Sequence, residues 1–308
     1  MSNHSSPPGD ADGCAQAFGR TRSRLGRAVA LSALTVAVAL FLFLGQIRHP
    51  AGPARGKGIR DLSAAPETSF PAPPTFHVAT FNIHSGVGRN GRRDMTRTIE
   101  VLTDADFIGL NEVRGVLPWD TANQAQAIGT ALRRGWLFAP TERRWWCDHF
   151  GNALVSRLPI GAWERIPLAG TQSKGHRNML KAEAVLGGRS VRIIVTHIAR
   201  GVDRSAQLTQ VIRAFLDLTP PCVLMGDLNT RAEEEPLRSL LRQPDTVDAL
   251  AHAGTNTTSG RIDWIVLRGL EVVRAGLRDN GASDHPCAWA EVRLPASLAP
   301  HAEPKAAP

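Results

Sequence analysis

Polar side chains stand at or near the ends of several apolar segments of this chain. The stretch PCVLMGDLNT, residues 221–230, runs from apolar residues into Gly226, Asp227 and Asn229. Its short length and apolar content predict a buried strand, and because strand side chains alternate, Asp227 and Asn229 should face the same way. A carboxylate and a carboxamide held over one spot could position a water molecule. An Asx turn after an ordinary strand would explain the same two residues without chemistry.

Comparable polar residues accompany other apolar segments. Taken singly, a histidine or glutamate at a strand end has an ordinary explanation at the surface. Asp263 is harder to explain, because a carboxylate between Ile262 and Trp264 is costly to bury unless it is paired. Together these residues supply carboxylates, imidazoles and carboxamides, which suit metal-assisted hydrolysis of a phosphate ester. The candidate residues are Asn82, Glu112, His197, Asp227, Asn229, Asp263, Asp284 and His285.

The elements that would position these residues alternate between strands and helices. Two segments, 181–186 and 191–197, predict a hairpin around Gly187 and Gly188. Many strands with helices between them fit a layered α/β sandwich better than a Rossmann sheet. Further strands are predicted at 76–83, 107–113, 151–157, 221–226, 261–267 and 285–294, and helices at 94–102, 124–132 and 206–216.

Seven short motifs in a fixed order resemble those of the endonuclease/exonuclease/phosphatase superfamily. This superfamily includes deoxyribonucleases, abasic-site endonucleases, inositol phosphatases and neutral sphingomyelinases. The resemblance implies a four-layer αββα sandwich of two mixed sheets, with the site where the loops of both sheets converge, and it is strongest to small bacterial members. It covers nearly all of residues 76–294, through the motifs FNIHSG, LNEV, GNALVSRLPI, TH, GDLN, RIDWI and SDHP.

The resemblance implies a divalent-metal site. Glu112 would bind Mg²⁺, with Mn²⁺ as an alternative, since a carboxylate suits a hard cation that keeps several waters. Asp284 would be a second metal ligand or a structural carboxylate. Asn82 would orient the phosphate or the metal's ligands.

The resemblance also assigns roles in the hydrolysis. Asp227 would orient or deprotonate the attacking water, and Asn229 would fix its geometry. His285, oriented by Asp263, would contact the scissile phosphate, and His197 would contact a phosphate oxygen or support the leaving group. The implied reaction is in-line attack of water on phosphorus without a covalent enzyme intermediate.

Two positions depart from the common pattern of the superfamily. Asn111 precedes the metal glutamate where glutamine is common, and without any tyrosine in the chain His149 or Phe150 takes the neighbourhood of a tyrosine. Asn152 fits the variant found in small bacterial members and is a weak candidate for substrate contact.

Two further clusters are open to two interpretations. His176 and Arg177, after Lys174, are either a solvated loop or a phosphate-binding loop. Trp145 and Trp146 are interpreted as packing residues, with a stacking or lipid-contact patch as the alternative.

The N-terminal region predicts a membrane anchor. Residues 28–47 carry no charge and, as a helix of 20 residues, would span about 30 Å, the thickness of a bilayer core. A cleaved secretory signal is the alternative. The polar, small residues of 1–27 predict a disordered tail. Positive residues flank the apolar segment on both sides, but four arginines packed within residues 20–27 favour a cytoplasmic tail and a single-pass topology with an extracytoplasmic catalytic domain. A Pro-rich linker is expected over 48–75, the catalytic domain over 76–294 and a disordered tail over 295–308.

The charge of the catalytic domain bears on its substrate. The net charge of +8 divides into +4 for residues 1–75 and +4 for residues 76–308, so the catalytic domain is only mildly basic. Nucleic acid is therefore an alternative substrate that charge does not indicate. The expected activity is that of a phosphodiesterase on nucleic acid, phospholipid head groups or soluble phosphoesters. An inactive membrane-tethered binding module is the rival hypothesis, and no protein partner is evident.

Overall fold

The computed structural model describes residues 12–58, 75–116, 121–170, 175–186, 189–252 and 260–295. The chain divides into two units, residues 1–47 and residues 48–308. The first contains helix α1, Asp12–Gln46. This helix begins well before residue 28, so residues 12–27 are helical in the structure and not disordered as expected. Within it, Val29–Gln46 has a mean hydropathy of 2.2 and is long and apolar enough to cross a membrane, a property that signal sequences share.

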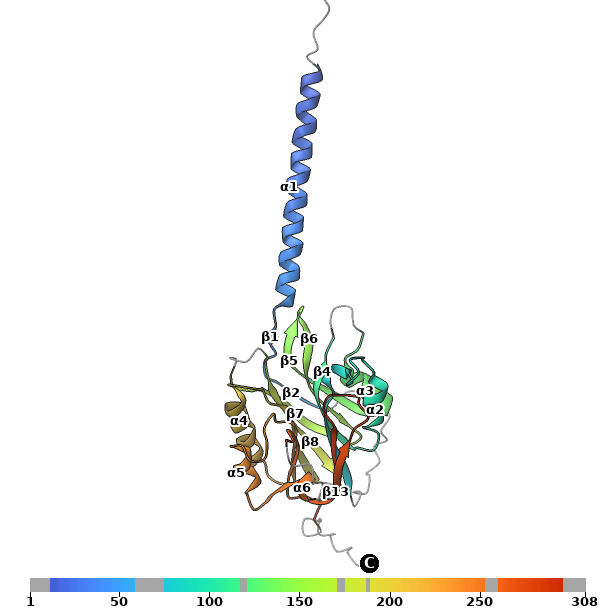
Figure 1. Ribbon diagram of the computed structural model, residues 1–308, viewed down its shortest axis with the longest axis vertical. Helices are drawn as coiled ribbons and strands as arrows, with labels where there is room; N and C mark the ends of the chain where they lie inside the picture. The colour runs from blue at the N-terminus through green and yellow to red at the C-terminus, as the bar shows by residue number, and fades with distance from the viewer. Residues whose placement is uncertain are drawn as a thin grey trace, which may run out of the picture. The chain divides into compact units, whose positions relative to one another are not determined.

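The second unit is built on two mixed sheets of seven strands each (Figure 1). The first sheet has the order β1-β5-β6-β4-β3-β14-β13 and the second β11-β12-β10-β9-β8-β7-β2. The strands of the first sheet are β1 (His49–Pro50), β3 (Phe76–Asn82), β4 (Phe107–Arg114), β5 (Gly135–Arg144), β6 (Cys147–Ser156), β13 (Glu271–Arg278) and β14 (Cys287–Arg293). Those of the second are β2 (Ala54–Lys57), β7 (Ile160–Pro167), β8 (Asn178–Leu186), β9 (Arg189–His197), β10 (Cys222–Asp227), β11 (Thr246–Asp248) and β12 (Asp263–Arg268).

Three apolar clusters join four layers, which confirms the predicted αββα sandwich. The largest lies between the sheets and includes Phe107 and Leu180. The second packs α3 (Gln124–Leu132) and the end of α2 (Met95–Glu100) on the first sheet. The third packs α4 (Arg204–Leu216) and α5 (Leu237–Leu241) on the second sheet. A short 3-10 helix, η1 (His84–Gly86), follows β3, and α6 (Ala249–His252) follows β11.

The expected linker is partly folded into the sheets. His49 and Pro50 pair with Arg143 and Glu142 of β5. Ala54–Lys57 pairs with β7 at the edge of the second sheet. The sheets therefore begin at residue 49 and not at 76, because an edge strand can pair through its backbone whatever its side chains. Residues 59–74 and the tail from 296 lie outside the described residues.

Strand register brings the candidate residues to one end of both sheets. On β10, Asp227 pairs with His197 of the parallel strand β9 and with Asp263 of the antiparallel strand β12. In the other sheet, Asn82 of β3 pairs with Asn111 of β4.

Gly226 has φ 142°, and a Cβ there would meet the Thr196 carbonyl oxygen at 1.8 Å, so this close approach of β9 and β10 requires glycine.

Candidate active site

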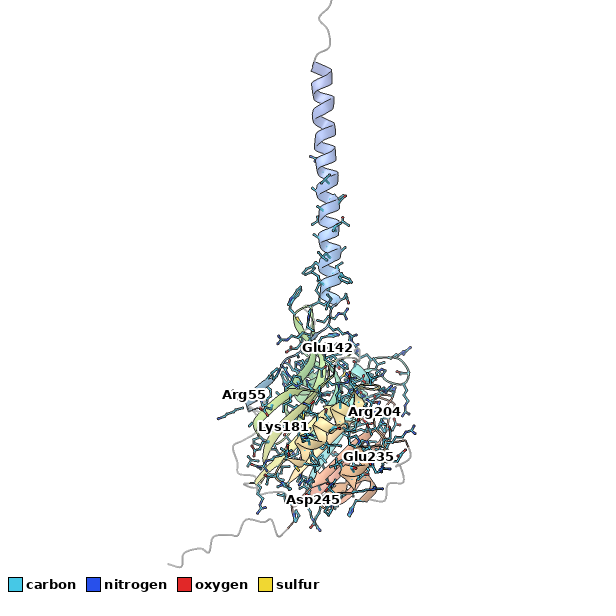
Figure 2. All side chains as sticks on the ribbon, turned by 90° about the vertical axis from the view of Figure 1, so that its left-hand side faces the viewer. Arg55, Glu142, Lys181, Arg204, Glu235 and Asp245 are labelled. Atoms are coloured by element: carbon cyan, nitrogen blue, oxygen red, sulfur yellow. The ribbon has the colours of Figure 1, made fainter. Side chains whose placement is uncertain are left out.

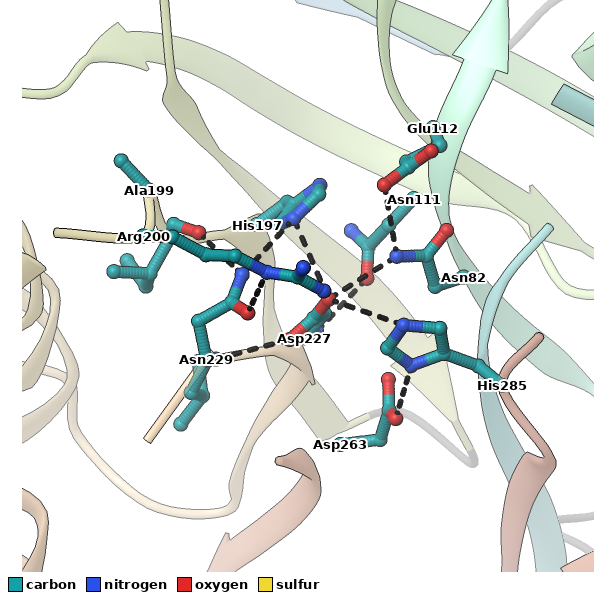
Figure 3. A network of polar contacts seen from close by, with 12 residues as sticks. Asn82, Asn111, Glu112, His197, Ala199, Arg200, Asp227, Asn229, Asp263 and His285 are labelled. Carbon is teal, nitrogen blue, oxygen red and sulfur yellow. Dashed lines mark hydrogen bonds and ion pairs between the residues drawn. The ribbon is translucent and has the colours of Figure 1, made fainter. Parts of the chain in front are cut away.

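Asp227 occupies the centre of a buried polar network (Figure 3). Its Oδ1 accepts a hydrogen bond from the Asn229 backbone amide at 2.9 Å. Its Oδ2 accepts one from Asn82 Nδ2 at 3.1 Å and lies 3.4 Å from His197 Nε2 and 3.8 Å from His285 Nε2. One carboxylate oxygen is thus held by the backbone, and the other faces the remaining polar groups.

The pKa of Asp227 is shifted toward neutrality. Burial and the charge of Asp263 raise the pKa of Asp227 to about 7, although His285 and the hydrogen bonds from Asn229 and Asn82 oppose the shift. The Asp227 backbone amide donates to Asn111 Oδ1 at 2.9 Å, which fixes the end of β10 against the other sheet. A carboxylate with a pKa near neutrality can accept a proton from water at the pH of a cell.

His285 is oriented by a buried carboxylate. Its Nδ1 lies 2.6 Å from Asp263 Oδ2, and its backbone amide donates to Ser283 Oγ at 3.2 Å. Burial opposes the charged form, but the hydrogen bond and charge of Asp263 and the charges of Asp227 and Asp284 raise the pKa of His285 to about 9. The imidazole is therefore cationic near neutral pH, with Nε2 directed at Asp227.

His197 has the opposite character. Its burial, together with the positive charges of Arg177, His285 and Arg200, holds its pKa well below its usual range. Asn229 Nδ2 lies 3.2 Å from His197 Nε2 and donates to the Ile198 carbonyl at 2.8 Å. The site thus combines one neutral and one cationic imidazole on either side of a single carboxylate.

Glu112 enters the site through an irregular stretch of β4. The register with β6 shifts between Leu110 and Val113, and Glu112 itself has φ 56°. Such a bulge redirects a side chain, and positive φ in a non-glycine residue is uncommon outside functional sites and turns. Asn82 Nδ2 donates to Glu112 Oε1 at 3.1 Å. Asn82 therefore joins the two carboxylates, Glu112 and Asp227.

The donor set fits a divalent cation. Oxygen ligands such as carboxylates and carboxamides are those that Mg²⁺ prefers. Donor atoms of Asp227, Asp263 and His285 lie within 4.8 Å of one another, but His285 could ligate a cation only as the neutral imidazole, so the carboxylates are the candidate ligands. Asp263 Oδ1 is buried without a hydrogen-bond partner among the described residues, and such an atom is costly unless a cation or water satisfies it.

Asp284 lies farther out than the other carboxylates. Its side chain is 56% exposed, and its Oδ1 is 3.7 Å from His84 Nδ1. Ser283 Oγ donates to the same oxygen at 3.1 Å. Asp284 thus stands at the rim of the site, next to the cationic His285.

Asn152 has a structural setting that differs from the expected substrate contact. Its Oδ1 accepts from Asn111 Nδ2 at 2.8 Å, and its Nδ2 donates to Asn178 Oδ1 at 2.9 Å and to the Asn178 carbonyl at 3.1 Å. Both of its amide protons are therefore used inside the protein. Asn111 also donates to the Thr196 carbonyl at 3.0 Å, so these three asparagines tie the sheets together beneath the site.

The loop before β8 brings Arg177 toward the carboxylates. Burial lowers the pKa of Arg177, while the negative charges of Glu112, Asp227 and Glu142 oppose that shift, so its guanidinium lies in the field of the site. Its Nε is buried without a hydrogen-bond partner among the described residues. His176 is half-buried beside it, whereas Lys174 lies outside the described residues.

Arg200 was not found by sequence reasoning. Its Nε donates to Asn229 Oδ1 at 2.9 Å, and Arg204 donates to the Asn229 carbonyl at 3.0 Å. The arginine three residues after the TH motif was the available signal, but arginines are common on surfaces. A groove of about 540 Å³ opens beside Asn229, and it is lined by Arg200, Gly201, Arg204, Asn229, Arg231, Glu233, Glu234 and Ile262.

The comparisons with known proteins identify a family. Residues 79–285 match the model of the Endonuclease/Exonuclease/phosphatase family. The chain belongs to this family. The matched segment begins in β3 and ends at His285, so it includes Asn82, Glu112, Asp227, His197 and His285. No curated protein matches the chain significantly.

Solved structures share the fold. An endonuclease/exonuclease/phosphatase from Beutenbergia cavernae is 22% identical over 72% of each chain, with a TM-score of 0.58. A conserved protein of unknown function from Enterococcus faecalis is 17% identical over 71% of this chain and 100% of that one, with a TM-score of 0.58. D. rerio TDP2, complexed with a single-strand DNA product, is 17% identical over 72% of this chain and 100% of that one, with a TM-score of 0.53.

Proposed function

We propose that this protein is a membrane-anchored, divalent-metal-dependent phosphodiesterase that hydrolyses its substrate by in-line attack of water. The observation that carries the proposal is the placement of Asp227 Oδ2 between Asn82, His197 and His285. Family membership supports a hydrolase acting on phosphoesters or nucleic acids.

Asp227 is the residue best suited to activate the water. Its Oδ1 is held by the Asn229 amide, which leaves Oδ2 to accept a proton. A pKa of about 7 lets Oδ2 take that proton near neutral pH and release it after turnover. Asn229, with φ 46°, turns the chain so that its backbone amide points back at the carboxylate.

Positive groups around Asp227 would stabilise the charge that builds on phosphate oxygens. His285 is held cationic by Asp263 and can donate through Nε2. Arg177, in the field of Glu112 and Asp227, can contact a second oxygen with its planar guanidinium. Fixed donors of this kind strengthen as charge develops and need no reorganisation during the reaction.

Glu112 and Asp284 are the residues that we propose to hold Mg²⁺, with Asn82 orienting Glu112. When bound, the ion would supply charge neutralisation at the phosphate oxygens. The buried carboxylates of Asp227 and Asp263 add to the negative potential that favours a cation here.

Helix α1 is proposed to be an uncleaved anchor with the catalytic domain outside the cytoplasm. Its apolar segment, Val29–Gln46, supports the anchor, and the preceding arginines support the orientation. Alkaline phosphatase fused after Pro295 should be active, and a fluorescent protein that requires the cytoplasm should be dark. The opposite pattern would place the domain in the cytoplasm, and a soluble form starting near residue 50 would identify a cleaved signal.

A substrate screen tests the activity itself. The full chain in detergent should hydrolyse bis-para-nitrophenyl phosphate in Mg²⁺ and lose that activity in excess EDTA. Single-stranded DNA belongs in the same screen because D. rerio TDP2 was captured with such a product, and phospholipids belong there because of the proposed anchor. No metal-dependent hydrolysis of any of the three would refute the proposal.

A further inference from the structure

The turn between β5 and β6 breaks a local rule of hairpin structure. Its two residues, Trp145 and Trp146, have φ 52° and φ 60°. Two-residue turns with positive φ at both positions favour Asn-Gly or Asp-Gly, and bulky residues are rare there. Local rules of this kind are broken mostly at functional sites, where another gain offsets the strain.

The two rings are presented at the surface. Trp146 is 70% exposed and Trp145 is half-buried. Their ring centroids are 6.5 Å apart in an edge-to-face arrangement. Packing, the interpretation that the sequence favoured, therefore does not describe Trp146. An exposed indole has an apolar body and one polar N–H, a combination suited to the boundary between lipid and water.

The connection from the apolar helix to β1, the strand beside this hairpin, is short. Only Ile47 and Arg48 lie between Gln46, the last residue of α1, and His49 of β1. Three residue steps span at most about 11 Å. His49 pairs with Arg143 and Pro50 with Glu142, in antiparallel register. Followed backward from His49, this register leads toward the turn.

Two further contacts hold β1 against the hairpin. The Ala51 amide donates to the Thr141 carbonyl at 2.9 Å, and Ala51 is buried. The Arg48 guanidinium lies 3.5 Å from Glu142 Oε1, whose side chain is only 3% exposed; Glu142 is labelled in Figure 2. Residues 48–51, which follow the helix, are therefore fixed to β5.

We propose that the hairpin tip, Arg143–Trp146, rests in the headgroup region of the bilayer that α1 spans. This inference relies on the anchor in the proposed function. Trp side chains concentrate at membrane–water interfaces, and arginines beside them can contact lipid phosphates. These positive charges come from Arg48, Arg143 and Arg144. Arg143 Nε also donates a hydrogen bond to Asp148 Oδ1 at 2.9 Å.

The contact would set the distance of the active site from the membrane. Strand β6 runs from the turn to Asn152, whose side chain bonds to Asn111 beneath Asp227. Six residues of strand span about 20 Å. The tip would thus keep the site at most about one strand length from the bilayer surface, within reach of phosphoesters displayed there.

Fluorescence quenching in vesicles tests this proposal. The full chain is reconstituted in phosphatidylcholine–phosphatidylglycerol vesicles brominated either near the headgroup or near the end of the acyl chain. The double variant Trp145→Asn/Trp146→Gly keeps a favoured turn sequence. The difference between wild type and variant isolates the two indoles, and their emission should be quenched at least about twofold more by the shallow bromines.

A matched control and an activity assay separate the outcomes. Trp163→Phe removes a half-buried indole that packs against the core and should leave the shallow quenching unchanged. The double variant should keep wild-type hydrolysis of soluble bis-para-nitrophenyl phosphate, which shows that it has folded. Equal quenching in wild type and double variant would overturn the membrane contact. Absence of hydrolysis by the wild type would refute the proposed function and would leave the membrane contact of the hairpin tip standing.

Discussion

Asp263 Oδ2 and His285 Nδ1 lie 2.6 Å apart, although Asp263 begins β12 of the second sheet and His285 lies just before β14 of the first. This contact fixes the imidazole so that Nε2 faces Asp227 Oδ2. It also explains why a carboxylate can stand at the start of a strand between Ile262 and Trp264, because the histidine supplies the charge that its burial requires.

Replacing Asp263 by asparagine should uncouple this pair. The carboxamide keeps the volume but removes the charge that raises the pKa of His285 to about 9, so that pKa should fall toward its ordinary value. Turnover should fall more than substrate affinity. NMR titration of the metal-free protein measures the shift, and an unchanged His285 titration would show that the contact does not control the imidazole.

Replacing Glu112 by glutamine should remove most of the metal-dependent activity. The side chain can still bond to Asn82, but the charge that would hold the cation is lost. We expect kcat/KM to fall by at least about 10²-fold, with rescue by raised Mg²⁺ or Mn²⁺ only in the wild type. Glu164→Gln, at a half-exposed position on β7, is the matched control. Wild-type activity of Glu112→Gln, or full activity in excess EDTA, would defeat the assignment.

Arg177 should bind substrate through its guanidinium. Arg177→Ala is expected to lower kcat/KM by about 10- to 10²-fold, the effect of losing a charge-assisted hydrogen bond. Arg177→Lys should recover only part of this, because an ammonium cannot make a bidentate contact. Arg242→Ala, an exposed arginine beyond α5, serves as the control. Equal kinetics for Arg177→Ala and this control would exclude Arg177 from the site.

The metal-free protein should lose thermal stability as pH rises. The pKa of Asp227 is raised from 3.8 to about 7, so the folded state retains a proton that the unfolded state has lost between these values. The pKa of His285 is raised from 6.5 to about 9, so its stabilising contribution is complete below pH 6.5 and is lost as pH rises through 9. The lowered pKa of His197 opposes these effects only below pH 6.5, so melting temperature in EDTA should fall from pH 6.5 to pH 9. Asp227→Asn should change the profile below pH 7 only, by removing the Asp227 contribution, and an identical profile in that variant would contradict the assigned pKa.

The sequence predicts the core of the fold because the central strands are apolar and short. Strands β3, β4, β10 and β12 and helix α3 lie where the patterns place them, and the β8–β9 hairpin is confirmed. The strands β5, β7 and β13 were missed. Their burial is irregular, and polar residues such as Arg165, Arg274 and Glu271 obscure the alternation. Strands β1 and β2 were missed because prolines and glycines there indicate a linker, while their pairing depends only on the backbone.

The site was predicted through motif order, and its finer geometry was not. Asp227, Asp263, His197 and His285 meet as the resemblance implies. No local pattern could show that the Asn152 side-chain amide donates to Asn178, or that Arg200 donates to Asn229, since both contacts join segments distant in sequence.

The most direct test of the role of Asp227 is the rate at which Asp227→Asn hydrolyses bis-para-nitrophenyl phosphate in saturating Mg²⁺. If Asp227 Oδ2 accepts the proton of the attacking water, kcat should fall by at least about 10³-fold, within the range that general base catalysis contributes. Asp217→Asn, an exposed aspartate at the end of α4, should leave kcat unchanged. A folded Asp227→Asn protein with a kcat within about tenfold of the wild type would contradict the central role of Asp227.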